Sequence, residues 1–127
     1  MDISNFPGFH EPVKLWSRRF ETPIRNKPGL YILVHEKTEK LYIGSALKVG
    51  ARIVHHISDL RNKVHPNHLM QEAWDDDNSF RALVKLTETR EEAYREEQEW
   101  IDKLKGTGIL LNISTEDVSA PTKGLKF

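Results

Sequence analysis

The sequence predicts a single α+β domain, because short strand-like runs alternate with longer segments of helical periodicity. The clearest strand signal is a pair of apolar runs, Gly29–His35 and Leu41–Gly44, on either side of the charged segment Glu36–Lys40. Both runs are rich in Ile, Leu, Val and Tyr, which favour pleated, half-buried strands, and the charged segment suits an exposed hairpin turn. With 127 residues, the chain is long enough to bury one modest core without disulfides.

The residues on either side of this hairpin suggest helices. Before it, Val13–Phe20 mixes apolar and basic residues at a spacing that allows a short helix packing on the domain. After it, from about Lys48, the apolar period becomes helical. One stripe of an amphipathic helix is formed by Val49, Ile53, Ile57 and Leu60. Arg52 and His56 lie four residues apart on a neighbouring stripe, so their side chains lie one above the other.

Two more helices and a third strand complete the pattern. His68–Trp74 fits a short helix, and Phe80–Leu86 alternates as a strand does. Thr89 and Glu92 form a capping box, which predicts the start of a helix that runs to about Lys105. A short apolar segment and a polar tail follow.

The helix predicted after Thr89 carries a carboxylate where packing does not call for one. Its apolar stripe consists of Ala93, Trp100, Ile101 and Leu104, and Glu97 falls on the same stripe. A lone carboxylate on a core-facing stripe is costly unless it is paired, protonated or bound to a cation. Glu97 is therefore a candidate ligand for a hard cation.

Composition excludes several classes of protein. The chain has no cysteine, which rules out a disulfide framework and any cysteine-ligated zinc or iron–sulfur site. No apolar run approaches the roughly 18–20 residues that span a bilayer, and we expect no secretory signal. The net charge is zero but unevenly placed. Residues 1–70 carry eleven Lys and Arg against six Asp and Glu, and residues 71–127 carry eight against thirteen. The basic half can face a polyanion.

Five residues stand out from a pure packing pattern: Tyr31, Tyr42, Arg52, His56 and Glu97. Together they contain a candidate general base, a cation for an anionic transition state and a hard-cation ligand, which are the parts that phosphodiester hydrolysis needs. A single carboxylate without cysteine points to Mg²⁺ or Mn²⁺. Each residue also has a structural interpretation, because tyrosines pack in strands, Arg52 and His56 can form a solvated pair, and Glu97 can form a salt bridge.

The histidines raise the alternative of a zinc site. His55 and His56 are followed by His65 and His68. Their spacing matches no structural zinc pattern, so zinc is disfavoured.

Taken in order, these residues resemble the GIY-YIG nuclease superfamily. The resemblance covers about residues 28–114, and its motifs are Gly29-Leu30-Tyr31, Tyr42-Ile43-Gly44, Arg52 with His56, Glu97 before an aromatic residue and Ile, and Asn112 in Leu-Asn-Ile-Ser. It implies a stand-alone catalytic domain similar to those of homing endonucleases and repair nucleases. The implied fold is a small three-stranded antiparallel sheet flanked by helices, with residues 1–27 as an N-terminal extension and residues 115–127 as a C-terminal tail.

The resemblance also implies an activity, namely divalent-metal-dependent cleavage of DNA to 5′-phosphate and 3′-hydroxyl ends. One Mg²⁺ or Mn²⁺ ion would be bound per site. Such a protein is expected inside the cell with DNA, either in the cytoplasm of a prokaryote or phage-infected cell or in another intracellular setting. The alternative is a non-catalytic nucleic-acid-binding or scaffolding module on the same fold.

Four of the implied roles concern the phosphate and the attacking water. Tyr31 would be the general base or a water-positioning phenol, assisted by Tyr42. Arg52 would orient and neutralise the scissile phosphate. His56 would contact the phosphate or the nucleophile network and could share the base role.

The remaining implied roles concern the metal and its support. Glu97 would hold the metal ion, and Asn112 would orient a neighbouring side chain or the Glu97 loop. Some members of the family carry a lysine just after the second triplet or just before the arginine. Those places hold Ser45 and Ala51 here, so no assisting lysine is expected.

Basic residues outside the motifs predict contacts to the DNA backbone, which Arg52 would share. They are Lys14, Arg18, Arg19, Arg25, Lys27 and Lys48. Neither flank of the motif region resembles a zinc finger or a helix-turn-helix. DNA would therefore be recognised by its structure or loosely by sequence, or a protein partner would supply the targeting.

Overall fold

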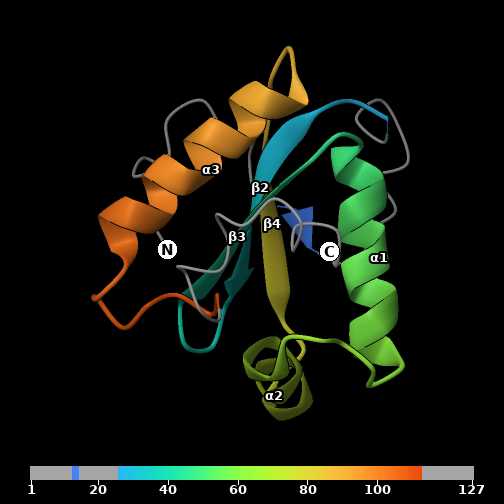
Figure 1. Ribbon diagram of the computed structural model, residues 1–127. Helices are drawn as coiled ribbons and strands as arrows, with labels where there is room; N and C mark the ends of the chain where they lie inside the picture. Colours follow the sequence, from blue (N-terminus) through green and yellow to red (C-terminus); the bar gives the residue numbers. More distant parts are fainter. Residues whose placement is uncertain (1–12, 15–25, 113–127) are drawn as a thin grey trace.

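The elements form a central sheet with helices on both faces (Figure 1). The computed structural model describes residues 13–14 and 26–112, of which 13–14 by their backbone alone. The elements are β1 (Val13–Lys14), β2 (Gly29–His35), β3 (Lys40–Ala46), α1 (Val49–Arg61), α2 (His68–Asp76), β4 (Phe80–Leu86) and α3 (Arg90–Leu104). The predicted α+β fold is confirmed: β4, β2 and β3 form the expected three-stranded antiparallel sheet between helices, and the two-residue strand β1 adds a fourth strand.

The sheet has the order β1-β4-β2-β3, and all of its pairings are antiparallel. The prediction of a helix at Val13–Phe20 is wrong at its first two residues, which form strand β1 beside Ala82 and Arg81 of β4. This pairing covers part of the edge of β4, whose backbone N–H and C=O groups would otherwise be unpaired there. Residues 15–20 lie outside the described part of the chain.

Strand β2 lies between β4 and β3, and every one of its residues is buried. The prediction of half-buried strands is therefore wrong for β2. Its apolar run is continuous because both faces are covered. Tyr31 and Leu33 pack with residues of α1 and α2, whereas Ile32 and Val34 pack with Ile101 of α3. Helices α1 and α3 lie on opposite sides of the sheet (Figure 1).

A four-residue turn, 36–39, joins β2 to β3, and Glu39 adopts the left-handed backbone conformation (φ 61°). On its outer edge, β3 is covered by the segment that follows α3. The N–H of Leu41 donates to the carbonyl of Ile109 (2.8 Å), and the N–H of Leu111 donates to the carbonyl of Leu41 (2.5 Å). The edge strand is thus held by residues far along the chain.

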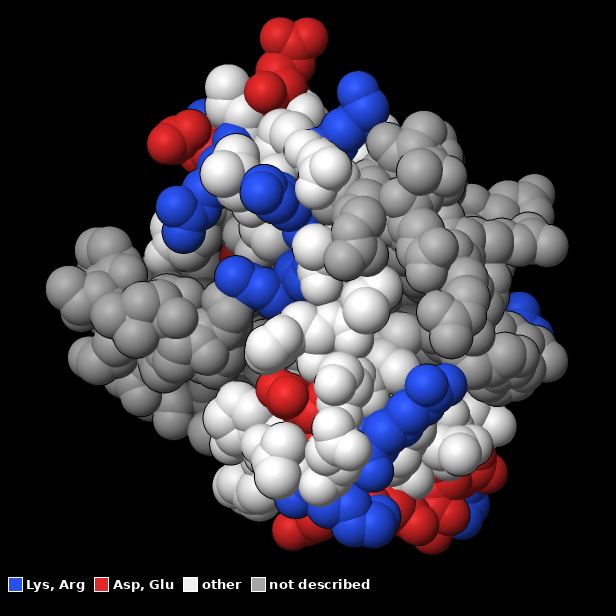
Figure 2. All heavy atoms as spheres, turned by 90° about the vertical axis from the view of Figure 1, so that its right-hand side faces the viewer, with Lys and Arg blue, Asp and Glu red and all other residues white. Residues whose placement is uncertain are grey.

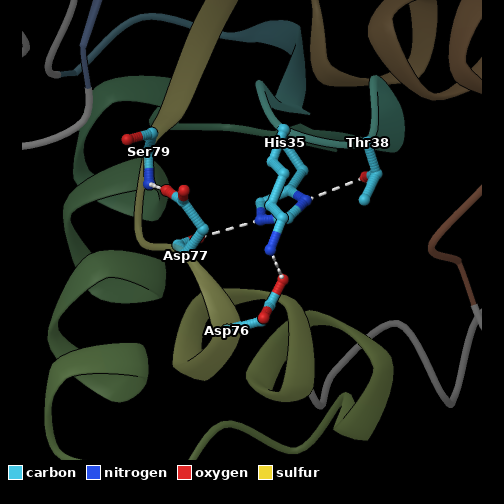
Figure 3. Close-up of polar contacts among 6 residues, drawn as sticks. His35, Thr38, Asp76, Asp77 and Ser79 are labelled. Atoms are coloured by element: carbon cyan, nitrogen blue, oxygen red, sulfur yellow. Dashed lines mark hydrogen bonds and ion pairs between the residues drawn. The ribbon is translucent and has the colours of Figure 1, made fainter.

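The buried side chain of His35 ties the β2–β3 turn to the connection between α2 and β4 (Figure 3). Its Nε2 lies 2.8 Å from the carbonyl oxygen of Asp77, and its Nδ1 lies 2.8 Å from the hydroxyl of Thr38. Since a carbonyl can only accept, the Nε2–H donates to Asp77. The carboxylate of Asp77 in turn accepts from the N–H of Ser79 (2.9 Å).

The helices begin and end close to their predicted positions. The predicted stripe of α1 is buried throughout, and the predicted cap of α3 is present, since the hydroxyl of Thr89 accepts from the N–H of Glu92 (3.0 Å). No helix within the described residues is both long and apolar enough to span a membrane.

Candidate active site

Two glycines allow the backbone and a tyrosine ring to approach closely. Gly44 of β3 lies directly opposite Tyr31 of β2. A Cβ atom on Gly44 would lie 2.4 Å from the phenolic oxygen of Tyr31, so the ring crosses over the bare backbone at this position. A Cβ atom on Gly29 would lie 2.6 Å from the carbonyl oxygen of Lys85. Any larger residue at either place would displace the tyrosine or the neighbouring strand.

Tyr31, Tyr42 and His56 form one buried aromatic cluster between the sheet and α1. The two tyrosine rings are 6.3 Å apart between centroids, and the His56 ring lies 5.5 Å from Tyr31 and 5.3 Å from Tyr42. The phenolic oxygen of Tyr31 is hydrogen-bonded to Nε2 of His56 at 2.7 Å. The structure therefore brings together three of the side chains that the sequence singled out.

The cluster is electrically neutral around pH 7. Burial raises the pKa of Tyr31 well above its usual value and also raises that of Tyr42. The guanidinium of half-buried Arg52 acts in the opposite direction on both phenols, but burial prevails. Burial, assisted by His65 and Arg52, lowers the pKa of His56 well below its usual value. Both phenols thus keep their protons, and the imidazole is uncharged.

Glu97 of α3 is buried, as its place on the apolar stripe predicted. Its Oε1 accepts a hydrogen bond from the hydroxyl of Ser45 (2.5 Å). Burial raises its pKa to about 7, against the opposing effects of Ser45 and Arg52. Within residues 26–112, no lysine or arginine forms an ion pair with this carboxylate, so the salt-bridge interpretation of Glu97 is not supported.

The site lies on both faces of the edge strand β3. Tyr42 and Gly44 belong to the face covered by α1, whereas Ser45 reaches Glu97 on the face covered by α3. Although they come from opposite layers, these groups act on one another. The charge of Glu97 raises the pKa of Tyr42, and Arg52 lowers that of Glu97.

Asn112 holds the backbone of β3 between Tyr42 and Gly44. Its side-chain amide donates to the carbonyl of Ile43 (2.9 Å), and its Oδ1 accepts from the N–H of Ile43 (3.0 Å). The direct contact is thus with main chain, whereas the resemblance implied a neighbouring side chain or the Glu97 loop. By these two hydrogen bonds Asn112 fixes the position of the β3 backbone next to Tyr42.

Two of the predicted DNA-contacting lysines, Lys27 and Lys48, are exposed at the start of α1. The carbonyl of Lys27 accepts from the N–H of Val49 (2.9 Å), so both lysines lie just ahead of Arg52. Figure 2 shows lysine and arginine side chains in the upper part of the α1 face and again in its lower part, with mostly uncharged atoms and an acidic side chain between them. Three further arginines (Arg18, Arg19 and Arg25) and the side chain of Lys14 lie outside the described part of the chain.

Sequence reasoning missed two residues that contact the site. Ser45 was noted only as a place without lysine, and His65 only as a zinc alternative. In the structure, Nε2 of His65 is hydrogen-bonded to Nδ1 of His56 (2.8 Å). No sequence periodicity relates His65 to His56, so only the fold reveals the contact.

The zinc alternative has no support in the described part of the chain. No group of three or more His, Cys, Asp or Glu suited to a metal ion occurs among residues 26–112.

The donor set fits a hard divalent cation that keeps most of its water. Glu97 is a buried carboxylate with one oxygen engaged by Ser45 and no cationic partner in the described chain. A single carboxylate is how Mg²⁺ is often held when a substrate phosphate supplies further oxygens. Glu97 would hold the ion.

Comparison with known proteins identifies the family of this chain. Residues 27–109 match the family described as the GIY-YIG catalytic domain. The chain belongs to the GIY-YIG family. No curated protein matches it.

Two solved structures share the fold of this GIY-YIG domain. A mutant of the catalytic domain of intron endonuclease I-TevI is 23% identical, with a TM-score of 0.62 over 70% of this chain and 95% of that one. The catalytic domain of homing endonuclease I-TevI is 25% identical, with a TM-score of 0.56 over 68% of this chain and 100% of that one. The family match makes the chain an endonuclease domain with a DNA substrate, and its family generally depends on a divalent metal.

Proposed function

We propose that this GIY-YIG protein hydrolyses phosphodiester bonds of DNA to 5′-phosphate and 3′-hydroxyl ends, with one Mg²⁺ or Mn²⁺ held by Glu97. The observation that carries the proposal is the buried carboxylate of Glu97 beside the edge strand that also bears Tyr42 and Gly44. A divalent ion bound there would neutralise charge on the phosphate and on the leaving oxygen.

Arg52 would orient and neutralise the scissile phosphate. It is half-buried, and its charge opposes the rise that burial gives to the pKa values of Tyr31, Tyr42 and Glu97. A guanidinium suits this role because it stays charged and can bind two phosphate oxygens at once.

Tyr31 would position the attacking water. A phenol whose pKa burial has raised is protonated at neutral pH, and it must lose that proton before it can serve as a base. Between the two implied roles, the raised pKa of Tyr31 thus favours the water-positioning phenol. Tyr42 would assist from the next strand, and His56 would complete the polar network around the nucleophile.

The exposed lysines at the start of α1, Lys27 and Lys48, would contact the DNA backbone, together with Arg18, Arg19 and Arg25. Backbone contacts hold DNA without reading its sequence, so a protein partner could supply targeting. Lys27→Glu and Lys48→Glu should each weaken DNA binding and lower the salt slope of log K by about 1. Lys105→Glu, at the C-terminal end of α3, is the control, and an unchanged salt slope in both test variants would contradict the assignment.

Cleavage is tested with supercoiled plasmid in the presence of Mg²⁺ or Mn²⁺. The wild type should convert the plasmid to nicked or linear forms, Glu97→Ala should not, and the matched variant Glu99→Ala, which changes an exposed neighbour on α3, should cleave like wild type. DNA ligase should reseal the nicks, because it requires the proposed ends. An intact plasmid with either metal would refute the proposal, and equal cleavage by Glu97→Ala would reveal a contaminating nuclease.

A further inference from the structure

A chain of three hydrogen bonds runs from the candidate nucleophile site to the start of α2. Tyr31 is bonded to Nε2 of His56 (2.7 Å), and Nδ1 of His56 is bonded to Nε2 of His65 (2.8 Å). Nδ1 of His65 is bonded to the backbone N–H of Asn67 (3.0 Å). Tyr31, both histidines and Asn67 are all buried.

The last bond sets the direction of all the others. A backbone N–H can only donate, so Nδ1 of His65 must accept and carries no hydrogen. The hydrogen of neutral His65 is then on Nε2 and is donated to Nδ1 of His56. That nitrogen cannot carry a hydrogen either, so the hydrogen of His56 is on Nε2 and points at the oxygen of Tyr31. Both imidazoles are neutral, in keeping with the lowered pKa values that burial gives them.

The backbone N–H of Asn67, the donor at the α2 end of the chain of hydrogen bonds, is held in place by its neighbours. The side chain of Asn67 caps α2 by accepting from the N–H of Met70 (3.0 Å), and its amide donates to the carbonyl of Leu111 (3.0 Å). The backbone N–H of His65 donates to the side chain of Gln71 (3.1 Å), and its ring stacks on His56 at 5.0 Å between centroids. The N–H of Asn67 therefore cannot turn away to let His65 adopt the other tautomer.

We infer that His65 is a positioning residue, which holds His56 as the tautomer that donates its Nε2–H to Tyr31. The inference rests on the proposed function, because it assigns the proton arrangement of that same site. His56 would then not withdraw the proton of Tyr31, since the nitrogen that faces the phenol already carries a hydrogen. With the phenolic oxygen accepting from His56, the hydroxyl hydrogen of Tyr31 is turned away from His56 and is free to be donated to Tyr42, with which Tyr31 is hydrogen-bonded.

The tautomers can be read directly by long-range ¹H–¹⁵N correlation NMR of the full, metal-free chain without DNA. We expect both His56 and His65 to carry their hydrogen on Nε2. A hydrogen on Nδ1 of His56 in the wild type would overturn the inference, whatever the activity of the protein. Because this measurement needs no substrate, it remains informative even if the protein cleaves no plasmid, an outcome that would refute the proposed function instead.

Variants at His65 test its importance for the reaction. His65→Ala should leave His56 as a mixture of tautomers and lower kcat about 10- to 100-fold, by analogy with the loss when the outer hydrogen-bond partner of a metal-binding histidine is removed, with little change in KM. His65→Gln can still donate an N–H toward His56 and should recover most of kcat. His68→Ala, which changes an exposed histidine on α2, is the control and should change nothing.

Circular dichroism confirms that each variant is folded. A folded His65→Ala protein with reduced kcat but an unchanged His56 tautomer would contradict the inference. So would a mixed tautomer at His56 with unchanged kcat.

Discussion

Replacing Glu97 by glutamine should stabilise the metal-free protein at alkaline pH. The pKa of Glu97 is about 7, whereas an exposed glutamate titrates near 4.5, because burial disfavours the charged form. Folding therefore strengthens proton binding at Glu97. The stabilisation by this proton is fully present below about pH 4.5 and is lost as the pH rises through about 7.

The size of the effect follows from the difference between the two pKa values. A gap of about 2.5 pH units corresponds to about 3 kcal/mol of unfolding free energy. The side chain of the Glu97→Gln variant would not titrate, and its carbonyl oxygen can still accept the hydrogen bond of Ser45. The difference in unfolding free energy between the variant and the wild type should thus rise by about 3 kcal/mol, in favour of the variant, from pH 4.5 to pH 9.

Urea unfolding followed by tryptophan fluorescence, in the presence of a chelator, measures this difference at several pH values. Glu99→Gln removes a carboxylate from an exposed position of the same helix and should show no such gain. Adding Mg²⁺ at pH 8.5 should stabilise the wild type, by about 2.7 kcal/mol at one hundred times the dissociation constant, and leave Glu97→Gln unaffected. If the stability difference between Glu97→Gln and the wild type does not change between pH 4.5 and pH 9, the carboxylate is not desolvated and the reasoning for a metal ligand there is wrong.

Three further substitutions test the supports of the site, with urea unfolding and plasmid cleavage as the measurements. Gly44→Ala should push the Tyr31 ring aside, lowering activity about 100-fold or more and stability by about 1–3 kcal/mol. Gly106→Ala, at φ +85° in open space, should cost about 1 kcal/mol without loss of activity, and equal activity of the two alanine variants would contradict the packing argument. Asn112→Ala removes two hydrogen bonds to β3 and should cost about 2 kcal/mol as well as activity. His35→Leu should cost a similar amount in stability but leave kcat unchanged, since it affects only the turn at the far end of the hairpin; a large fall in kcat would show that the turn supports the site.

The fold was largely predictable because periodicity records which face of each element is buried. The stripe of α1 and the capping box at Thr89 predicted their helices within a residue or two, and the alternation at Phe80–Leu86 predicted β4 with its observed bounds. The errors lie where the sequence pattern was short or where neighbouring strands determined the structure of the segment. Val13–Lys14 forms a strand because β4 offers an edge, and β2 is buried on both faces because of its central place in the sheet.

The site was predictable in part. Physical reasoning alone flagged Glu97, because a carboxylate on an apolar stripe requires an explanation, and the order of the motifs supplied the candidates Tyr31, Tyr42, Arg52 and His56. Ser45 and His65 could not be found in this way. Ser45 contacts Glu97, which lies 52 positions further along the chain, and His65 contacts His56, which lies 9 positions before it. In both cases the partner belongs to a different element, and no local pattern encodes such a contact.

The position of the site at an edge strand follows from its chemistry. The phenols and Arg52 come from the layer of α1, whereas Glu97 comes from the layer of α3, and an interior strand would keep the two layers apart. Beyond Ile43, no described segment is hydrogen-bonded to the outer edge of β3, so side chains of both layers can act on a phosphate beside that edge. Gly44 lies at this point, and its missing side chain lets Tyr31 reach across from the neighbouring strand. The glycine at position 44 is thus required by the close approach of the Tyr31 ring.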